Sequence, residues 1–279
     1  MIRDAASPPV ANATVDAVRQ MLNDARPESL TLLDVRMDQE YAATHIPGAR
    51  LLPLPELPDS LDSLDRQQPI IVYCRSGKRS AAAAAILAGA GFAHVTNMLG
   101  GISAWHGATA HGSPDTGLTM LSGKETPEQI LLTALGMEAA LEKFYAALAA
   151  TATASKDVLT RLAGFENKHL QHVYALYRKQ TGQTTDLAAL LADAAPEVEG
   201  GLPGQAFLDQ LGNTPQTPQE ALELAASVEA QAYDLYTRLA RQAGTSERAA
   251  LATALAQEEK QHLRIVASLM AAPAATSDT

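Results

Sequence analysis

The only cysteine of this 279-residue chain stands at the end of an apolar run and directly before a cluster of cations. Residues 70–85 read IIVYCRSGKRSAAAAA and contain Cys74. A thiol in such surroundings is either an inert buried side chain or a nucleophile whose ionisation is adjusted by its neighbours. The residues that follow favour the nucleophile, because an inert thiol has no use for a cationic turn.

The turn after Cys74 has the groups needed to hold an anion on sulfur. Arg75, Lys78 and Arg79 place three cations within five residues, and the N-terminus of the following helix adds partial positive charge. If the turn curls into a nest, successive backbone N–H groups also point at the sulfur. An ordinary thiol is about 3% ionised at pH 7, whereas a pKa near 6.5 would make roughly three-quarters of it thiolate. We therefore predict that Cys74 is the catalytic nucleophile.

A second set of candidate residues repeats within residues 126–271. A glutamate followed seven positions later by a tyrosine occurs twice, 91 residues apart, and the pattern Glu-x-x-His occurs twice, 93 residues apart. The alternative, a helical bundle with solvated glutamates and incidental histidines, does not account for the matched offsets. The repeated residues are Glu138 with Tyr145, Glu229 with Tyr236, Glu166 with His169, and Glu259 with His262.

The spacing of these residues suits a pair of metal ions. Residues at i and i+3 lie on one face of a helix, so each Glu-x-x-His pair can bind one centre. Four helices that supply Glu, Glu-x-x-His, Glu and Glu-x-x-His provide the ligands of carboxylate-bridged di-iron or di-manganese bundles. Four buried carboxylates would repel one another unless two divalent cations balanced them. The predicted ligands of two iron ions, with manganese or zinc as alternatives, are Glu138, Glu166, His169, Glu229, Glu259 and His262.

Several neighbouring side chains are candidates for supporting roles. Tyr145 and Tyr236 follow their glutamates by two helical turns, so they either hydrogen-bond the ligating carboxylates or pack in the core. Glu142, His172 and Glu258 are expected to face solvent or to contact the ligands from outside.

Two kinds of secondary structure must position these residues, and the length of the chain is sufficient for two domains. In residues 1–112, short apolar runs alternate with helical patterns, which indicates an α/β domain with a mainly parallel sheet. Residues 113–125, rich in Gly, Ser and Thr, are the predicted linker. The predicted strands are 31–36, 49–54, 70–74 and 94–99, and the predicted helices are 15–25, 37–48 and 79–92.

From residue 126 to residue 279 the apolar period is helical, and we predict an all-α domain. Thr126-Pro127 and Thr217-Pro218 are helix starts, with a threonine cap and a proline in the first turn, where its missing N–H costs nothing. A long connection at 181–216, with a helical candidate at 186–195, would join two helical hairpins as in a ferritin-like four-helix bundle. The predicted helices lie near 126–150, 153–180, 217–243 and 245–271.

The first half resembles the rhodanese family of sulfurtransferases over about residues 12–107. Residues 74–79 match its six-residue loop, whereas Cys-dependent phosphatases have an arginine at the position held here by Ser80. LLDVR at 32–36, HIPGA at 45–49 and GGISAW at 100–105 match the rhodanese pattern in order. Within these motifs, we expect Asp34 and Arg36 to form a buried polar pair, and His45 and Trp105 to serve packing.

The rhodanese resemblance implies a ping-pong reaction in which Cys74 takes up sulfane sulfur as a persulfide and passes it on. The donor would be thiosulfate, a polysulfide or glutathione persulfide, and the acceptor a thiol or cyanide. Arg75 and Lys78 would attract an anionic donor. The residues that would cradle the substrate are Arg75, Ser76, Gly77, Lys78, Arg79 and Ser80.

The second half, residues 126–271, resembles the rubrerythrin branch of the ferritin-like superfamily in its E-x₆-Y and E-x-x-H patterns. The resemblance implies a di-iron site that handles peroxide or oxygen. Rubrerythrins typically draw electrons from a Cys₄ iron module, which a chain with one cysteine cannot form.

The amino-acid composition limits which binding partners and which cellular location are expected for this protein. The formal net charge is −10, which argues against nucleic acid, and residues 113–279 carry most of it, with 12 Lys and Arg against 20 Asp and Glu. No apolar run is long enough to span a membrane, and the N-terminus lacks a secretory signal pattern. A single cysteine permits no intrachain disulfide, which fits a reducing cytoplasm. We expect a cytoplasmic homodimer.

These observations lead to two hypotheses. The first is a fused enzyme in which a rhodanese-type sulfurtransferase, working through a Cys74 persulfide, is coupled to a di-iron bundle with peroxidase or oxidoreductase activity. The second is a persulfide carrier or stress-sensing adaptor whose bundle stores metal or is purely structural.

Overall fold

The computed structural model of the protein describes residues 9–26, 28–118, 121, 124–192, 197–212, 214–244 and 246–271. The chain forms two compact units, Met1–Asp115 (unit 1) and Thr116–Thr279 (unit 2). The division falls within the predicted linker, residues 113–125, of which residues 119, 120, 122 and 123 lie outside the described residues. The extent of that linker stays a prediction.

Unit 1 is built on a five-stranded sheet in the order β1-β5-β4-β2-β3, in which every neighbouring pair is parallel. Parallel strands need crossover connections, and helices supply several of them. The structure confirms the α/β class and adds one strand, β1, that the sequence pattern does not predict. The strands are β1 Ala11–Ala13, β2 Thr31–Asp34, β3 Arg50–Leu51, β4 Ile70–Tyr73 and β5 Val95–Met98.

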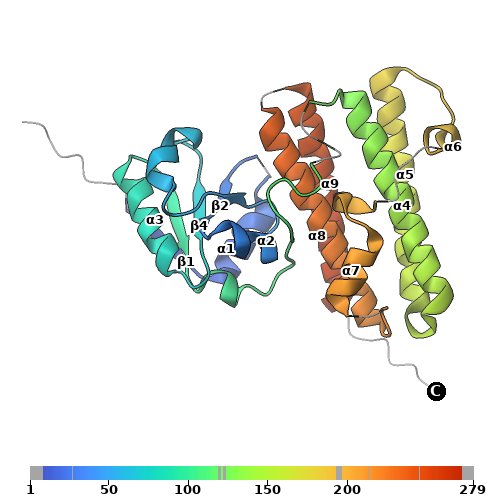
Figure 1. The fold of residues 1–279 in the computed structure, drawn as a ribbon, viewed down its shortest axis with the longest axis horizontal. Coiled ribbons are helices and arrows are strands. Elements are labelled where there is room, and N and C mark those ends of the chain that lie inside the picture. Colours follow the sequence, from blue (N-terminus) through green and yellow to red (C-terminus); the bar gives the residue numbers. More distant parts are fainter. Residues whose placement is uncertain are drawn as a thin grey trace, which may run out of the picture. The chain divides into compact units, whose positions relative to one another are not determined.

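Helices cover both faces of this sheet (Figure 1). Alternate strand residues point to opposite faces, so Leu33 and Val72 pack with α3 on one side. Leu32 and Ile71 pack with α1 and α2 on the other side. Two 3₁₀ segments complete the unit. The elements are α1 Val15–Asp24, α2 Asp38–Ala43, η1 Leu57–Ser63, α3 Lys78–Gly89 and η2 Gly101–Ala104.

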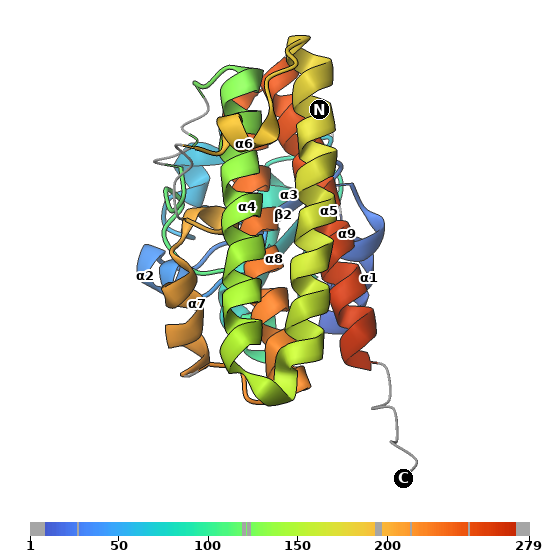
Figure 2. The ribbon, with the colours of Figure 1, turned by 90° about the vertical axis from the view of Figure 1, so that its right-hand side faces the viewer.

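Unit 2 contains four long helices that run side by side (Figure 2), which confirms the predicted helical bundle. The start of α4 is fixed by a capping box, because the Gln129 N–H donates to the Thr126 hydroxyl and the Gln129 side chain accepts from the Thr126 N–H. α4 packs along α5, and α8 packs along α9. The helices are α4 Pro127–Thr151, α5 Lys156–Thr181, α8 Pro218–Ala243 and α9 Glu247–Ala271.

The connection between α5 and α8 is long, as predicted, and contains short helices. α6 falls at the start of the helical candidate at 186–195, whose last three residues lie outside the described residues. α7 is an addition to the sequence analysis; it packs against α8, and its Phe207 is buried in the bundle. The elements are η3 Thr153–Ser155 between α4 and α5, and α6 Leu187–Leu190, η4 Glu199–Gly201 and α7 Gly204–Leu211 in the connection.

The core of unit 2 consists of two apolar clusters, and each of the four long helices contributes to both. On α4 the first cluster ends at Ala139 and the second begins at Leu141. On α9 the first cluster ends at Ala256 and the second contains Val266. On α5, α8 and α9 a gap between the two clusters leaves room for a polar layer. Among the described residues, no helix combines the length and apolar character needed to cross a membrane.

Candidate thiolate and metal sites

Cys74 lies directly after the buried strand β4 and before the turn that leads into α3, and it is only 1% exposed. The backbone N–H of Gly77 donates to the Cys74 Sγ at 3.2 Å, and the Ser80 hydroxyl lies 3.5 Å from the same sulfur. Ser80 itself is completely buried. The turn therefore curls around the sulfur and aims hydrogen-bond donors at it.

Two glycines allow the turn to close. Gly77 has φ +91°, a left-handed conformation that residues with a Cβ rarely adopt. Gly101 has φ +58°, and a Cβ there would lie 2.3 Å from the carbonyl oxygen of Cys74. Next to it, the Ile102 N–H donates to that carbonyl at 2.9 Å. Gly101, the second glycine of the GGISAW motif, thus lets this segment pack directly on the backbone of the cysteine loop.

The surroundings of Cys74 lower its pKa. Burial raises the pKa of the thiol, but hydrogen bonds from the Ser80 side chain and from the backbone N–H groups of Ser80, Ser76 and Gly77 outweigh burial. These donors stabilise the charged form of the sulfur. The lowered pKa of Cys74 agrees with the sequence analysis. Its main cause, however, is the hydrogen bonds donated by the turn rather than the three cations.

A chain of polar side chains behind Ser80 was missed by the sequence analysis. The Ser80 hydroxyl lies 2.7 Å from Asn97 Oδ1, and the Asn97 side chain donates to Asn12 Oδ1 at 2.9 Å. Asn97 is 2% exposed on β5. An asparagine within the predicted strand 94–99 was the only signal for it in the sequence.

The three cations of the turn have different surroundings. Arg79 makes a two-pronged ion pair with Glu40 on α2, with both N–O distances 2.7 Å. Its charge is therefore balanced by Glu40, a partner that no sequence motif indicated. Arg75 and Lys78 are exposed. The structure leaves these two side chains accessible to an incoming anion.

The remaining residues of the rhodanese-like motifs have structural contacts. Asp34 and Arg36 are buried and form an ion pair with an N–O distance of 2.6 Å, and Arg36 also donates to the Thr44 carbonyl at 2.7 Å. His45 is buried, stacks on Tyr41 and contacts its carbonyl through Nδ1 at 2.9 Å. These contacts hold the end of β2 and the loop after α2.

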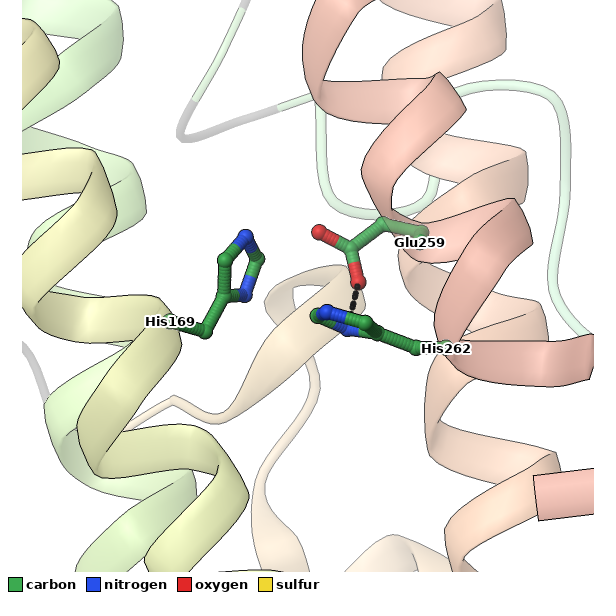
Figure 3. Close-up of side chains that lie close together, drawn as sticks. All are labelled: His169, Glu259 and His262. Atoms are coloured by element: carbon green, nitrogen blue, oxygen red, sulfur yellow. Dashed lines mark ion pairs between the residues drawn. The ribbon is translucent and has the colours of Figure 1, made fainter. Parts of the chain in front are cut away.

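In unit 2 the six predicted metal ligands meet inside the bundle, one or two from each long helix. Five of them lie in the gap between the two apolar clusters on α5, α8 and α9, and Glu138 lies at the end of the first cluster on α4, beside Ala139. Figure 3 shows His169 reaching from α5 toward Glu259 and His262 on α9. Five of the six are at least 93% buried, and His262 is partly exposed. The exposed fractions are 1% for Glu138, 3% for Glu166, 7% for His169, 2% for Glu229 and 1% for Glu259.

The ligand atoms form two overlapping groups. The atoms of Glu138, Glu166 and His169 lie within 4.8 Å of one another, and so do those of His169, Glu259 and His262. His169 Nδ1 lies 2.6 Å from Glu138, and the rings of His169 and His262 are 4.4 Å apart. Each group could hold a metal ion, and Glu229, which belongs to neither group, lies 3.2 Å from His262 Nδ1.

The charges in the cluster are mutually dependent. Burial, together with repulsion from Glu229 and Glu138, raises the pKa of Glu166 well above its usual value. Burial lowers the pKa of His262, but its ion pairs with Glu229 and Glu259 outweigh burial and raise that pKa to about 11. Four buried carboxylates thus share two imidazoles, and bound cations would favour the ionised form of the carboxylates.

The donor set fits divalent metal ions. Both carboxylate oxygens of Glu259 are buried and accept no well-aligned hydrogen bond from a described residue, which is costly for a buried carboxylate. Oxygen and imidazole ligands in this number suit iron, manganese or zinc. The carboxylate and histidine groups of unit 2 could therefore bind metal.

The neighbours of the ligands extend the cluster toward the surface. Glu258 contacts His169 Nε2 at 2.9 Å and His172 Nε2 at 3.0 Å, so it touches a predicted ligand from outside. Tyr145 and Tyr236 are fully buried, one in each apolar cluster. Their role as hydrogen-bond partners of the ligating carboxylates stays a prediction.

Comparison with known proteins assigns a family to each unit. The family model described as "Rhodanese-like domain" matches residues 14–108, and the model described as "Rubrerythrin" matches residues 129–270, about half of the chain. The chain therefore belongs to the rubrerythrin family and carries a rhodanese-like domain ahead of its rubrerythrin domain.

Similar proteins align with the rhodanese-like region. A protein named "Sulfurtransferase" from Allochromatium vinosum is 36% identical over 99 residues, which cover 36% of this chain and 88% of the relative. "Thiosulfate sulfurtransferase GlpE" of Ectopseudomonas mendocina is 36% identical, over 34% of this chain and 92% of the relative. "Putative sulfur carrier protein YrkF" of Bacillus subtilis is 35% identical, and this chain spans about half of it, 53%. Among solved structures, a rhodanese-like domain protein from Staphylococcus aureus is 33% identical over 34% of this chain and 90% of that chain, with a TM-score of 0.32.

Proposed function

We propose that the protein is an enzyme with two reaction centres. Unit 1 transfers sulfane sulfur through a persulfide on Cys74, and unit 2 holds two iron ions that reduce peroxide. The similarity of unit 1 to proteins named as sulfurtransferases supports the first activity, and the rubrerythrin match supports the second.

Sulfur transfer would take two balanced steps at Cys74. The thiolate attacks the outer sulfur of thiosulfate, the S–S bond of thiosulfate breaks, and sulfite leaves with the bonding electron pair. Cys74 then carries a persulfide. A thiol or cyanide attacks its outer sulfur, and the bonding electrons return to Cys74 as thiolate.

The observation that carries the sulfur-transfer proposal is the set of donors around the Cys74 sulfur. The Gly77 N–H and the Ser80 hydroxyl point at that sulfur, and they would stabilise the thiolate both as nucleophile and as leaving group. Arg75 and Lys78, which are exposed, would draw an anionic donor to the loop.

A thiosulfate:cyanide assay tests the sulfur-transfer proposal. We expect turnover in the wild-type protein and none in the Cys74→Ser variant, with the mass of one added sulfur on the wild-type chain after thiosulfate alone. Stable persulfidation with negligible turnover would instead indicate a carrier or adaptor. Absence of both would remove sulfur transfer altogether.

The peroxide proposal rests on the six ligands enclosed between the two apolar clusters. Glu138, Glu229 and the two Glu-x-x-His pairs would hold the metal ions in a site that is buried except at His262. Two ferrous ions would supply the two electrons that cleavage of an O–O bond takes up. The surrounding carboxylates would keep the charge of the site nearly neutral.

Anaerobic mixing of the ferrous protein with hydrogen peroxide tests the second activity. We expect the optical spectrum of the iron to change faster with peroxide than with air-saturated buffer. The Glu166→Ala variant should lose this change because it loses metal. An iron-loaded wild-type protein whose spectrum does not respond to peroxide would contradict the proposal.

A further inference from the structure

A pocket of about 420 Å³ opens between α5 and α9 beside the metal-ligand cluster. Four of its lining residues are predicted metal ligands, namely Glu166, His169, Glu229 and His262. A volume of this size lies within the range of small-molecule sites. It exceeds what hydrogen peroxide, with two heavy atoms, would need.

The rest of the pocket is largely apolar. Leu162 and Phe165 line it from α5, and Ile265, Val266 and Leu269 line it from α9. Leu162 and Val266 are buried, whereas Phe165 and Ile265 are open to solvent. The pocket thus offers a polar end at the ligands and an apolar end along the two helices.

The exposed apolar residues of unit 2 are concentrated here. Among the described residues of this unit, the large apolar side chains that remain exposed are Phe165, at 38%, and Ile265, at 44%. Both line this one pocket. Exposed apolar side chains gathered at a concave site indicate a binding surface rather than ordinary surface variation.

We propose that this pocket binds an alkyl or aryl hydroperoxide, with the apolar tail along Phe165 and Ile265 and the peroxide end at the metal ligands. The proposal rests on the peroxide activity of unit 2 and names its substrate class. A neutral tail is favoured over an anionic one, because residues 113–279 carry 12 cationic against 20 anionic side chains. Beside the predicted ligands, the pocket is lined by Lys168, His172 and Glu258, so its own lining offers no excess of cations.

Binding can be measured without turnover by titrating the full-length protein with 2-phenyl-2-propanol, the unreactive alcohol of cumene hydroperoxide. Calorimetry should show one binding site per chain in the metal-loaded wild-type protein. Phe165→Ser and Ile265→Asn should each weaken binding about tenfold, since each removes apolar contact area of the tail. Both residues are exposed, so these variants are expected to fold.

Met21→Gln is the matched control, because Met21 is an exposed apolar residue, at 42%, on a helix of unit 1. It should bind the alcohol as tightly as the wild type does. In single-turnover oxidation of the ferrous protein, the ratio of the second-order rate constants for cumene hydroperoxide and hydrogen peroxide should fall about tenfold in the two pocket variants and stay constant in the control.

Several results would overturn the pocket assignment. One is the absence of alcohol binding by the wild type, and another is equal binding by the wild type and the pocket variants. A third is a change of oligomeric state in the variants, which would identify this face as an interface between copies of the chain. Failure of the underlying activity would look different. If the wild-type protein binds the alcohol but reduces no peroxide, the peroxide function fails while the pocket remains.

Discussion

At the scale of single residues, the reactivity of Cys74 depends on which donors reach its sulfur. The sulfur is buried, which alone would keep it protonated. The backbone of the turn and the hydroxyl of Ser80 reverse that preference. Because Ser80 also lies 2.7 Å from Asn97 Oδ1, and its hydroxyl has a single proton, it can serve only one of the two acceptors at a time.

The Ser80 hydroxyl should therefore control the ionisation of Cys74. In the Ser80→Ala variant one donor to the sulfur is lost, so the pKa of Cys74 should rise, and less thiolate should be present at neutral pH. The pH profile of iodoacetamide alkylation measures this directly. Ser76→Ala is the control, because Ser76 acts through its backbone N–H, and its profile should match the wild type. Superimposable profiles for Ser80→Ala and wild type would contradict this role.

At the scale of elements, a surface ion pair ties α2 to the start of α3. Glu40 on α2 pairs with Arg79 on α3, and both side chains are about one-third exposed, at 30% and 35%. The hydrogen bonds from Arg79, opposed in part by burial, lower the pKa of Glu40 to about 2. The pair joins the helix that follows β2 to the loop that holds the thiol.

Stability linked to this pair should depend on pH. Because the pKa of Glu40 is lower in the folded state than its ordinary value of 4.5, its contribution is complete above about pH 4.5 and is lost as the pH falls toward 2. Glu40→Gln should lower the free energy of unfolding at pH 7 by up to about 1 kcal/mol. That difference should shrink between pH 4.5 and pH 3 in urea unfolding. Glu56→Gln is the control, because Glu56 is an exposed glutamate of unit 1, and its effect on the free energy of unfolding should not change with pH in this way. An equal pH dependence at both positions would show that the Glu40–Arg79 pair is not its source.

The elements that the sequence predicted are those whose signals are local. The Thr-Pro starts predicted α4 and α8, and the apolar run at 70–74 predicted β4. β1 was missed because Ala-Asn-Ala has no strand preference of its own, and it becomes a strand by pairing with β5. α7 was missed because its helix is short, and its Phe207 is secured by the bundle core rather than by a repeating pattern.

The site residues divide in the same way. The gathering of the Glu and His side chains in the bundle could be predicted because the helix period puts Glu166 beside His169, and the repeat then supplies the other pair; their role as metal ligands stays a prediction. Asn97 and Glu40 could not, because each meets its partner only through the fold, from another strand or helix. Contacts between residues that are far apart in the chain have no characteristic spacing in the sequence.

At the scale of the whole molecule, the protein contains two units with separate cores. Metal binding should stabilise only the unit that holds the ligands, because a ligand stabilises the folded state to which it binds. The two proposed reaction centres could therefore be perturbed one at a time.

Removal of metal should destabilise unit 2 selectively. Calorimetry of the metal-loaded protein should show two thermal transitions, and chelation should lower one of them by about 10 °C, as expected for a metal bound far above its dissociation constant. The other transition should not move. The His262→Ala protein serves as the reference, since it should hold less metal and its transition should shift less on chelation. A shift of both transitions, or of neither, would contradict metal binding confined to unit 2.

The most direct test of the account is the number of metal ions that the buried cluster holds. Native mass spectrometry of the full-length protein, loaded anaerobically with ferrous iron, should find two ions per chain in the wild type. It should find fewer in Glu166→Ala and His262→Ala, and two in Cys74→Ser, which alters only the other centre. A wild-type chain that binds no iron, or that binds it equally well without Glu166 and His262, would contradict a di-metal centre in the bundle.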